Sequence, residues 1–465
     1  MPTLFSGINL ALQSLLSQQQ AIEVVEHNVA NANTPGYRRQ EAILTATVPY
    51  SPAGMEHSFG SGQIGTGVKV DYIKRYSMEF FDGRYRREQA ESMRYSTSQN
   101  ILTQVESTLA ETGSDGLIPK LDDFWTGWQS LSADPTNLAL RSDLHDRASD
   151  LAQAFHWKAT GLLNIQKDQD LSVIQDVNEI NNTATQIAKL NEQISHVKST
   201  GDAPNDLMDQ RDLLLNRLAE LAGATSSVQT NGEVIVSIGG HALVVGHDTF
   251  QLTTSPDPVT KLANIVWSDG QSLTPSTGEL AGLIDARDKS IPDQLAGLDT
   301  VASTLITQVN NLHSTSYGLN NATGMNFFTG TSALSIDLNP AMNTLENIGT
   351  AAVPDQVGDG SIALKIAQIA NQTLLNGGTA TINQFYNNQV TTFGLELQQV
   401  TASAKDRDLV AKSLSSQRES ISGVNLDEEA ANLVKFQRAY QASARLMSVI
   451  DDMLDRVING MGAGH

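Results

Sequence analysis

The first thirty residues carry apolar or small side chains three and four positions apart, and the last forty do the same. The repeats occupy Leu4, Ile8, Ala11, Leu15, Gln18, Ile22, Val25 and Val29 at the start, with Gln18 as one polar interruption, and Leu433, Phe436, Tyr440, Ser443, Met447, Ile450, Leu454 and Val457 at the end. This spacing is the heptad of a coiled coil. The sequence therefore predicts that the chain begins and ends in amphipathic helices.

Each predicted end helix is too narrow to bury its apolar stripe alone. An isolated helix is marginal in water, so the two must pair with one another or with other copies of the chain. Asn, Thr, Pro and Gly in close succession over 31–36 end the first helix and force a turn. Assembly is therefore the first function that the pattern indicates.

The start of the last helix also has a recognisable pattern. Asn425 is placed as its N-cap, Glu428 three residues later completes a capping box, and Asp427 and Glu429 favour the positive helix end. Helix initiation explains this acidic cluster. It does not explain Gln437, Tyr440 and Gln441, which lie on or beside the apolar seam, where polar groups select register and partner in coiled coils.

The interior alternates between helical and extended patterns. Short extended runs are predicted over 42–48 and 67–73, period-two runs with hairpin turns over 225–267, and helices over 80–110, 117–131, 137–155, 162–199, 205–223, 278–313, 362–375 and 382–418. Trp125, Trp128 and Trp157 are expected to pack helices together, and Arg84, Arg86 and Arg87 to lie on a solvated helix face.

These elements predict a mainly α protein with an inserted β-rich domain, an α+β fold. The predicted domains are terminal coiled-coil helices over 1–36 and 423–465, an extended or β linker region over 37–94, a helical bundle over 95–224, 278–313 and 361–422, and a β-rich or irregular outer domain over 225–277 and 314–360.

Composition narrows the functional classes. The 465 residues have a net charge of −21, which argues against nucleic acid and against an anionic membrane as partners. There are no cysteines, so disulfides, thiolate catalysis and Cys-based zinc sites are excluded. No apolar run is long enough for membrane insertion, and the start of the chain lacks the basic residues of a cleavable signal peptide.

Motifs for catalysis or for cofactors do not stand out. The glycines over 60–65 match G-x-G-x-x-G, but an extended run follows where a phosphate-binding helix would be needed. His241 and His247 share a strand face without a third metal ligand, so ordinary surface histidines are favoured. We expect no catalytic residues, no cofactor and no metal, and hence no enzyme.

The segment 28–39, Asn-Val-Ala-Asn-Ala-Asn-Thr-Pro-Gly-Tyr-Arg-Arg, resembles the N-terminal signature of bacterial flagellar rod, hook and hook-associated proteins. The segments 422–429 and 436–442 look like the C-terminal signature of the same group. In the interior, 205–212 is similar to the hook–filament junction family within that group, as are Gly324–Phe328 and the spacing of Asp134-Pro135 to Arg141.

The resemblance implies a structural part of the flagellum that joins hook to filament by self-assembly into a hollow helical tube. It implies export through the flagellar type III system to the cell exterior. The implied partners are further copies of the chain, the hook protein, a second junction protein next to the filament, and an export chaperone at the C-terminal helix. The alternatives are another axial protein of hook or rod, a type III secreted coiled-coil effector or adaptor, and a hydrolase on a helical scaffold.

The candidate assembly residues are therefore those of the two end helices and their flanking signatures. They are Leu4, Ile8, Leu15, Ile22, Val25, Asn28, Val29, Asn31, Thr34, Gly36, Tyr37, Asn425, Asp427, Glu428, Leu433, Phe436, Gln437, Tyr440, Met447, Ile450 and Leu454.

Ordering a residue costs roughly 1 to 2 kcal/mol of backbone entropy. We therefore expect the unassembled chain to be ordered only from about 95 to 420.

Overall fold

The computed structural model describes residues 4–48, 65–110 and 116–460, which form two compact units. The first unit comprises Met1–Ala90, Glu179–Leu252 and Asp408–His465; the second comprises Glu91–Asn178 and Thr253–Arg407. The long helices α2 (Glu79–Leu109), α4 (Leu138–Ser199) and α9 (Ile382–Ser422) contribute residues to both units. Among the described residues, none of the helices is long and apolar enough to cross a membrane.

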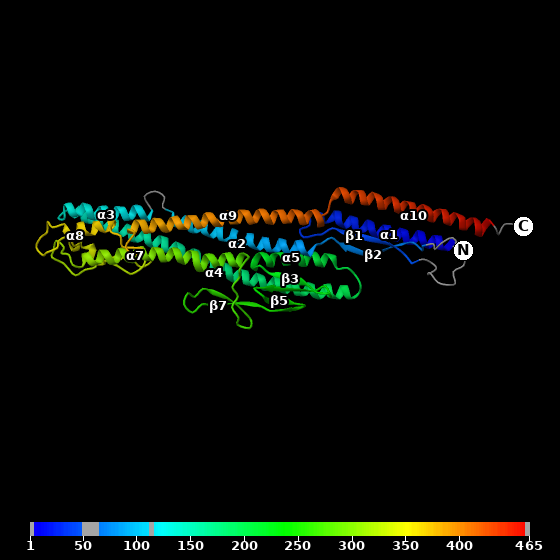
Figure 1. The fold of residues 1–465 in the computed structure, drawn as a ribbon, viewed down its shortest axis with the longest axis horizontal. Helices are drawn as coiled ribbons and strands as arrows, with labels where there is room; N and C mark the ends of the chain where they lie inside the picture. Colours follow the sequence, from blue (N-terminus) through cyan, green and yellow to red (C-terminus); the bar gives the residue numbers. More distant parts are fainter. Residues whose placement is uncertain (1–3, 49–64, 111–115, 461–465) are drawn as a thin grey trace. The chain divides into compact units, whose positions relative to one another are not determined.

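In the first unit, the end helices α1 (Leu4–Ala30) and α10 (Leu426–Gly460) lie side by side (Figure 1). Small residues allow this approach: the hydroxyls of Ser14 and Ser443 lie 2.7 Å apart. A Cβ added to Gly7 would come within 3.0 Å of Ile450. The predicted pairing of the two ends therefore occurs within one chain.

Most positions of the two predicted repeats are buried or half-buried, and three are exposed. Ala11, Val25 and Ile450 are buried, and Ile8, Leu15, Ile22, Leu433, Phe436, Met447 and Leu454 are half-buried. Val29, Tyr440 and Val457 are 44%, 38% and 42% exposed, so they lie outside the seam between α1 and α10, and their role in assembly stays a prediction. A straight helix has 3.6 residues per turn, so a strict seven-residue stripe rotates away from its partner. The side chain of Leu4 lies outside the described residues.

A β-hairpin covers a second face of α1. Strands β1 (Gln40–Ala46) and β2 (Val68–Arg75) pair antiparallel, with a register shift between Ile43 and Leu44. Ala42 packs with Ala21 and Val24, and Phe436 of α10 packs against this cluster. The glycine motif over 60–65 lies almost wholly outside the described residues, and a strand follows it as predicted.

The first unit also contains a small antiparallel sheet beside α4 and α5 (Asn205–Ala222). Its strands follow one another in space as in sequence: β3 (Thr225–Val228), β4 (Val234–Ile238), β5 (His241–Val245) and β6 (Asp248–Thr249). Asn191 of α4 is buried; its side chain donates to the carbonyls of Val234 and Gly246 and accepts from the Val234 amide. The predicted hairpins are confirmed, and one asparagine ties them to α4.

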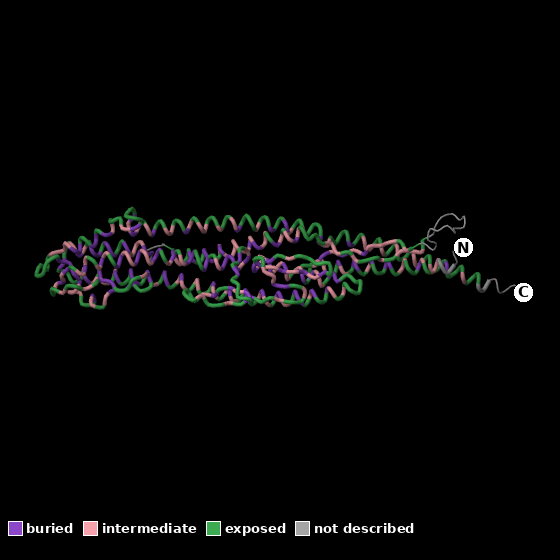
Figure 2. The backbone as a smooth tube through the Cα atoms, turned by 60° about the horizontal axis from the view of Figure 1, so that its bottom comes forward, coloured by how far each residue is buried: buried purple, intermediate pink, exposed green. Residues whose placement is uncertain are grey.

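The second unit is mainly helical. Besides parts of α2, α4 and α9 it contains α3 (Leu117–Ala133), β7 (Leu252–Pro256), β8 (Ala263–Trp267), α6 (Glu279–Asp285), the π-helical turn η2 (Ala286–Ser290), α7 (Ile291–His313), β9 (Phe328–Thr329), β10 (Asp337–Leu338), the 3₁₀ turns η3 (Pro340–Asn343), η4 (Leu345–Asn347) and η5 (Ile369–Asn371), and α8 (Ser361–Gln368). Figure 2 shows how strongly the middle of this unit is buried.

Aromatic rings fill one core of the second unit. Trp128 and Phe327 have ring centroids 5.1 Å apart, and His313 lies 5.3 Å from Phe327. Trp125 and Trp128 are buried as predicted, whereas Trp157 is 83% exposed and packs no helices. Within 314–360, Phe327 and Phe328 are fully buried in this core.

The fold class is confirmed as mainly α with inserted β structure. One boundary is wrong: the extended region predicted to reach residue 94 ends earlier, because α2 begins at Glu79. The helices predicted over 137–155 and 162–199 are one continuous helix, α4. The remaining domain boundaries stay a prediction.

Candidate functional site

The two ends of the chain are joined where α1 stops and α10 begins. The chain leaves α1 through a turn in which the amide of Thr34 donates to the carbonyl of Asn31 and that of Tyr37 to Thr34. Gly36 has a φ of +81°, a conformation that glycine adopts without strain. The turn directs Tyr37, Arg38 and Arg39 back along the first unit toward α10 and α5.

Asn28 is the hub of this junction. Its side chain is fully buried, and its Nδ2 donates to the Gln40 carbonyl at 2.8 Å and to the Glu429 carboxylate at 3.2 Å. Its Oδ1 accepts from the Gln40 amide at 2.9 Å and from the Tyr37 hydroxyl at 2.8 Å. An amide side chain has two donors and two acceptor lone pairs, so all four are used.

Arg39 and the acidic start of α10 form an ion pair across 390 residues of chain. The Arg39 Nε donates to the buried Glu429 carboxylate at 2.7 Å, and Nη1 lies 3.2 Å from Glu428. The Arg39 amide donates to the carbonyl of Ser422 at 2.9 Å. Asn425 caps α10 as predicted, because its Oδ1 accepts from the amides of Asp427 and Glu428. The Glu428 carboxylate lies against Arg39, so its side chain contributes to the joint, and its predicted part in a capping box stays a prediction.

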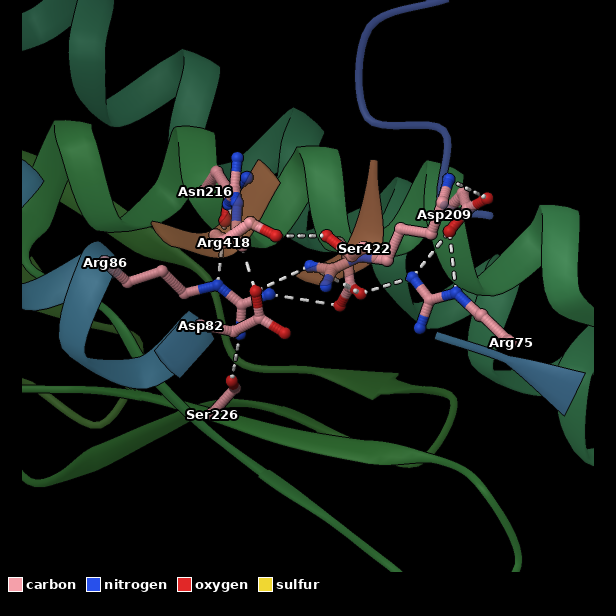
Figure 3. A network of polar contacts seen from close by, with 10 residues as sticks. Arg75, Asp82, Arg86, Asp209, Asn216, Ser226, Arg418 and Ser422 are labelled. Carbon is pink, nitrogen blue, oxygen red and sulfur yellow. Dashed lines mark hydrogen bonds and ion pairs between the residues drawn. The ribbon is translucent and has the colours of Figure 1, made fainter. Parts of the chain in front are cut away.

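A second set of charges joins the signature to the first turns of α5 (Figure 3). Arg38 Nη2 donates to Asp82 at 2.6 Å, and its backbone amide donates to Asp209 at 3.1 Å. Arg75 of β2 donates to Asp209 at 2.7 Å and to Asp212 at 2.6 Å. The segment 205–212 thus lies directly against the N-terminal signature.

Arg86 completes this network from α2. It donates to Asp212 and Ser226 at 3.0 Å each and to Asn216 at 2.9 Å. Arg86 is buried, so the predicted solvated face is wrong for this residue, whereas Arg84 and Arg87 are exposed. The reason is that Asp212 and Asn216 of α5 supply the acceptors that a buried guanidinium needs.

The electrostatics follow from burial among these charges. Burial alone would raise the pKa of Asp212, but the charges of Arg75, Arg86 and Arg38 outweigh it and lower that pKa. Burial also raises the pKa of Tyr37, and the neighbouring Asp206 and Asp209 add to the rise. The carboxylate of Asp212 is therefore ionised and the phenol neutral at physiological pH.

The predicted assembly residues outside the seam between α1 and α10 fall into two sets. Asn28, Tyr37, Asn425 and Glu428 meet at the junction, and Asn31 and Thr34 shape its turn. Val29, Asp427, Gln437 and Tyr440 are exposed.

Sequence reasoning missed the charges that close the junction. Asp82, Arg86, Arg75 and Arg418 lie outside the two signatures, and nothing in their spacing links them to it. The three aspartates of the segment 205–212, together with the five arginines within 38–86, were the available signal. These interactions hold segments together. Among the described residues, no group of acidic and histidine side chains could hold a metal ion.

Comparison with known proteins agrees with this architecture. Residues 102–328 match the family model of the flagellar hook-associated protein FlgK helical domain. Residues 8–38 match that of the flagella basal body rod protein, and residues 415–460 match the flagellar basal body rod FlgEFG protein C-terminal family. The terminal matches contain the two halves of the junction.

Two relatives that match nearly the whole chain share the name flagellar hook-associated protein 1. The chain is 29% identical to flagellar hook-associated protein 1 of Bacillus subtilis, with 100% of both chains covered. It is 27% identical to that of Escherichia coli, over 98% of this chain and 99% of the relative. The solved flagellar hook junction protein FlgK from Burkholderia pseudomallei has a similar fold, with a TM-score of 0.66 and 16% identity over 73% of this chain and 100% of that one.

The fold, the joined ends and these matches define a structural protein of the bacterial flagellum, not an enzyme. Within that class, the chain is similar over nearly its whole length to flagellar hook-associated protein 1, and this similarity supports a structural role at the hook–filament junction.

Proposed function

We propose that the chain performs this role by self-assembly into a hollow helical tube in which α1 and α10 form the inner layer. The observation that carries the proposal is the set of apolar side chains left exposed on the two paired helices. They are Leu12, Leu16, Leu426, Val434, Leu446, Val449, Met453 and Val457, each between 41% and 58% exposed. Such apolar surface on paired helices favours contact with further copies.

The proposed tube sits between the hook protein and a second junction protein next to the filament. Its subunits leave the cell unfolded through the flagellar type III system. The absence of cysteine in all 465 residues supports this route, since no disulfide has to form or break.

Complementation of a deletion strain tests the proposal. We expect the deletion to leave hooks intact but without filaments, with flagellin released to the medium, and the native gene to restore filaments. The double variant Leu446→Ser, Val449→Ser should fail to restore them, because it makes one exposed face of α10 polar. The matched control changes two exposed valines of the small sheet, Val228→Ser and Val245→Ser, and should restore filaments. Normal filaments on the deletion strain would refute the proposal.

Before export, the same α10 face is an aggregation hazard, and we propose that a small cytoplasmic chaperone covers it. The test uses full-length proteins as bait. The α10 double variant should capture much less chaperone than the native chain, and the control variant the native amount. Equal capture by all three would rule out α10 as the binding site.

A further inference from the structure

Trp157 of α4, in the second unit, is the most exposed aromatic side chain among the described residues, at 83%. The helix that carries it is firmly held. Phe155 and Ala159 are buried, and Nζ of the buried Lys158 donates to the carbonyl of Leu109, the last residue of α2, at 3.1 Å. The indole therefore projects from a fixed part of α4 and adds little to the core. Tryptophan is among the side chains that most often carry the binding energy of protein interfaces.

A pocket of about 320 Å³ lies in the same unit, on other elements. Its walls are residues of α2, of the π-helical turn η2 with the end of α6, and of α9, and we call it the α9 pocket. Tyr95 and Val400, both half-buried, give it an aromatic and an aliphatic surface. Sites for small ligands have volumes of roughly 300 to 1,000 Å³. The α9 pocket is at the lower end of this range, which suits a single ring system.

The charges on the walls of the α9 pocket cancel. Arg94 and Lys289 are positive, and Asp285 and Glu396 are negative. Arg94 donates to Asp285 at 2.7 Å, and Glu396 accepts from the Ser290 hydroxyl at 2.7 Å through Oε1, which leaves its Oε2 as an acceptor. The balance favours a neutral group over an ion. An indole is neutral, its faces attract cations, and its one polar atom is an N–H donor.

Trp157 cannot reach the α9 pocket of its own chain. Gln166 of α4 donates to the carbonyl of Arg287 at 2.9 Å, so this face of α4 packs against η2, which lines the pocket. Gln166 follows Trp157 by about two and a half helical turns, which places the two side chains on opposite faces of α4. Trp157 therefore points away from the turn that lines the pocket, toward whatever lies outside the molecule.

We propose that Trp157 of one copy enters the α9 pocket of the next copy. The indole ring contacts Val400 and the ammonium group of Lys289, and its N–H donates to the Glu396 carboxylate. The two surfaces differ, so each copy offers one and receives one. Repetition of such a contact builds a ring or a helix instead of a closed pair. The proposal rests on the self-assembly proposed above, and it adds a contact between the second units of neighbouring copies.

Sedimentation velocity over a range of concentrations tests this contact. The parent protein is the full-length chain with Leu446→Ser and Val449→Ser, so that α10 contributes little to association. We expect this parent to associate. Trp157→Ala removes the indole, and Ser403→Phe fills the α9 pocket with a ring of its own chain. Each should weaken association at least about tenfold, because each removes one half of an anchor contact.

Two matched controls separate the contact from general surface changes. Leu171→Ala shortens another exposed apolar side chain of α4, and Thr401→Phe adds a ring to the exposed surface of α9 outside the pocket. Both should associate like the parent. Circular dichroism of all variants checks that the helices are intact.

A one-to-one mixture of the Trp157→Ala and Ser403→Phe chains gives the sharpest result. The first keeps its pocket and the second keeps its indole, so the mixture retains one working contact and should form heterodimers that grow no further. The proposal is overturned if the parent stays monomeric up to millimolar concentration, if either variant associates like the parent, or if the mixture stays monomeric or forms longer assemblies. These results leave the tube to its own test in the deletion strain. Normal filaments there, with heterodimers in the mixture, would refute the tube and leave only this contact between copies.

Discussion

Asn28 shows how one side chain can join segments that are far apart in the chain. It contacts the turn after α1, strand β1 and the first turn of α10 through four hydrogen bonds. Glu429 and Gln40 would keep buried polar groups without partners if it were removed. The four hydrogen bonds that Asn28 makes where the two chain ends meet therefore explain why an asparagine stands at this position of the signature.

We expect Asn28→Ala to destabilise the junction by roughly 2 to 4 kcal/mol, since it removes four bonds and leaves buried partners unsatisfied. Hydrogen exchange should accelerate over 28–46 and 425–436, and it should stay unchanged over 117–131 of the second unit. Asn33→Ala is the control, because Asn33 is exposed in the same turn. Equal exchange in Asn28→Ala and native protein would show that the hub carries little stability.

His313 offers a residue-scale prediction in the second unit. Its Nδ1 lies 2.7 Å from the Met325 carbonyl, and its Nε2 accepts from the Gly349 amide, so the buried ring is neutral. Burial lowers its pKa from 6.5 to about 4, and the charge of Arg141 lowers it further. Between these values the unfolded state binds the proton more strongly. The contribution of His313 to the free energy of unfolding is therefore complete above pH 6.5 and is lost as pH falls toward 4.

The loss amounts to roughly 3 kcal/mol, from 1.36 kcal/mol for each of the 2.5 pH units between 6.5 and 4. Urea unfolding of the second unit, followed by tryptophan fluorescence at pH 7 and pH 4.5, measures it. His313→Gln should be less stable at pH 7 but should lose less on acidification. His247→Gln, at an exposed position, should track the native protein. If the free energy of unfolding fell equally with pH in His313→Gln and in the native protein, His313 would not be the cause of the loss.

At the scale of elements, the turn after α1 depends on backbone geometry more than on packing. Gly36 has a φ of +81°, and a Cβ there would find its nearest neighbour at 3.6 Å, an ordinary contact. Gly36→Ala should cost about 1 to 2 kcal/mol through backbone strain alone. Gly83→Ala, on the open face of helix α2, should instead stabilise by roughly 0.5 to 1 kcal/mol.

Urea midpoints of the first unit, from tyrosine fluorescence, should therefore move in opposite directions for the two alanine variants. Equal shifts would mean that Gly36 is not required for its conformation.

The same scale shows what the sequence could predict. Periodicity predicted the end helices and the hairpins, because each of these elements is specified by one repeating pattern of apolar positions. It missed the burial of Arg86 and the exposure of Trp157, because those depend on which element packs alongside. The sequence predicted only part of the junction between the chain ends. Signatures at both ends indicated that they belong together, but the arginines and aspartates that close the joint come from β2, α2 and α5.

For the whole molecule, the joint between the chain ends changes which residues we expect to be ordered in the unassembled chain. The sequence predicted order only from about 95 to 420. Asn28, Arg38 and Glu429 are buried in the first unit, which moves both limits outward. Beyond Glu429, by contrast, Ile450 is the one buried side chain of α10 among residues 430–457.

We therefore expect α10 to be the segment whose protection depends most on assembly. In the dilute chain its helix packs on one side only, so the contacts that offset about 1 to 2 kcal/mol of backbone entropy per residue are few. Amides over 431–457 should exchange orders of magnitude faster than those of 177–194 in α4, where Val177, Ile180, Ile187 and Ile194 are buried. In the proposed assembly, neighbouring copies would cover Leu446, Val449 and Met453, and the exchange of 431–457 should then slow to that of α4. Residues 28–40 should be protected in both states, because the joint forms within one chain. If 431–457 were as protected in the dilute chain as α4, folding of α10 would not be coupled to assembly.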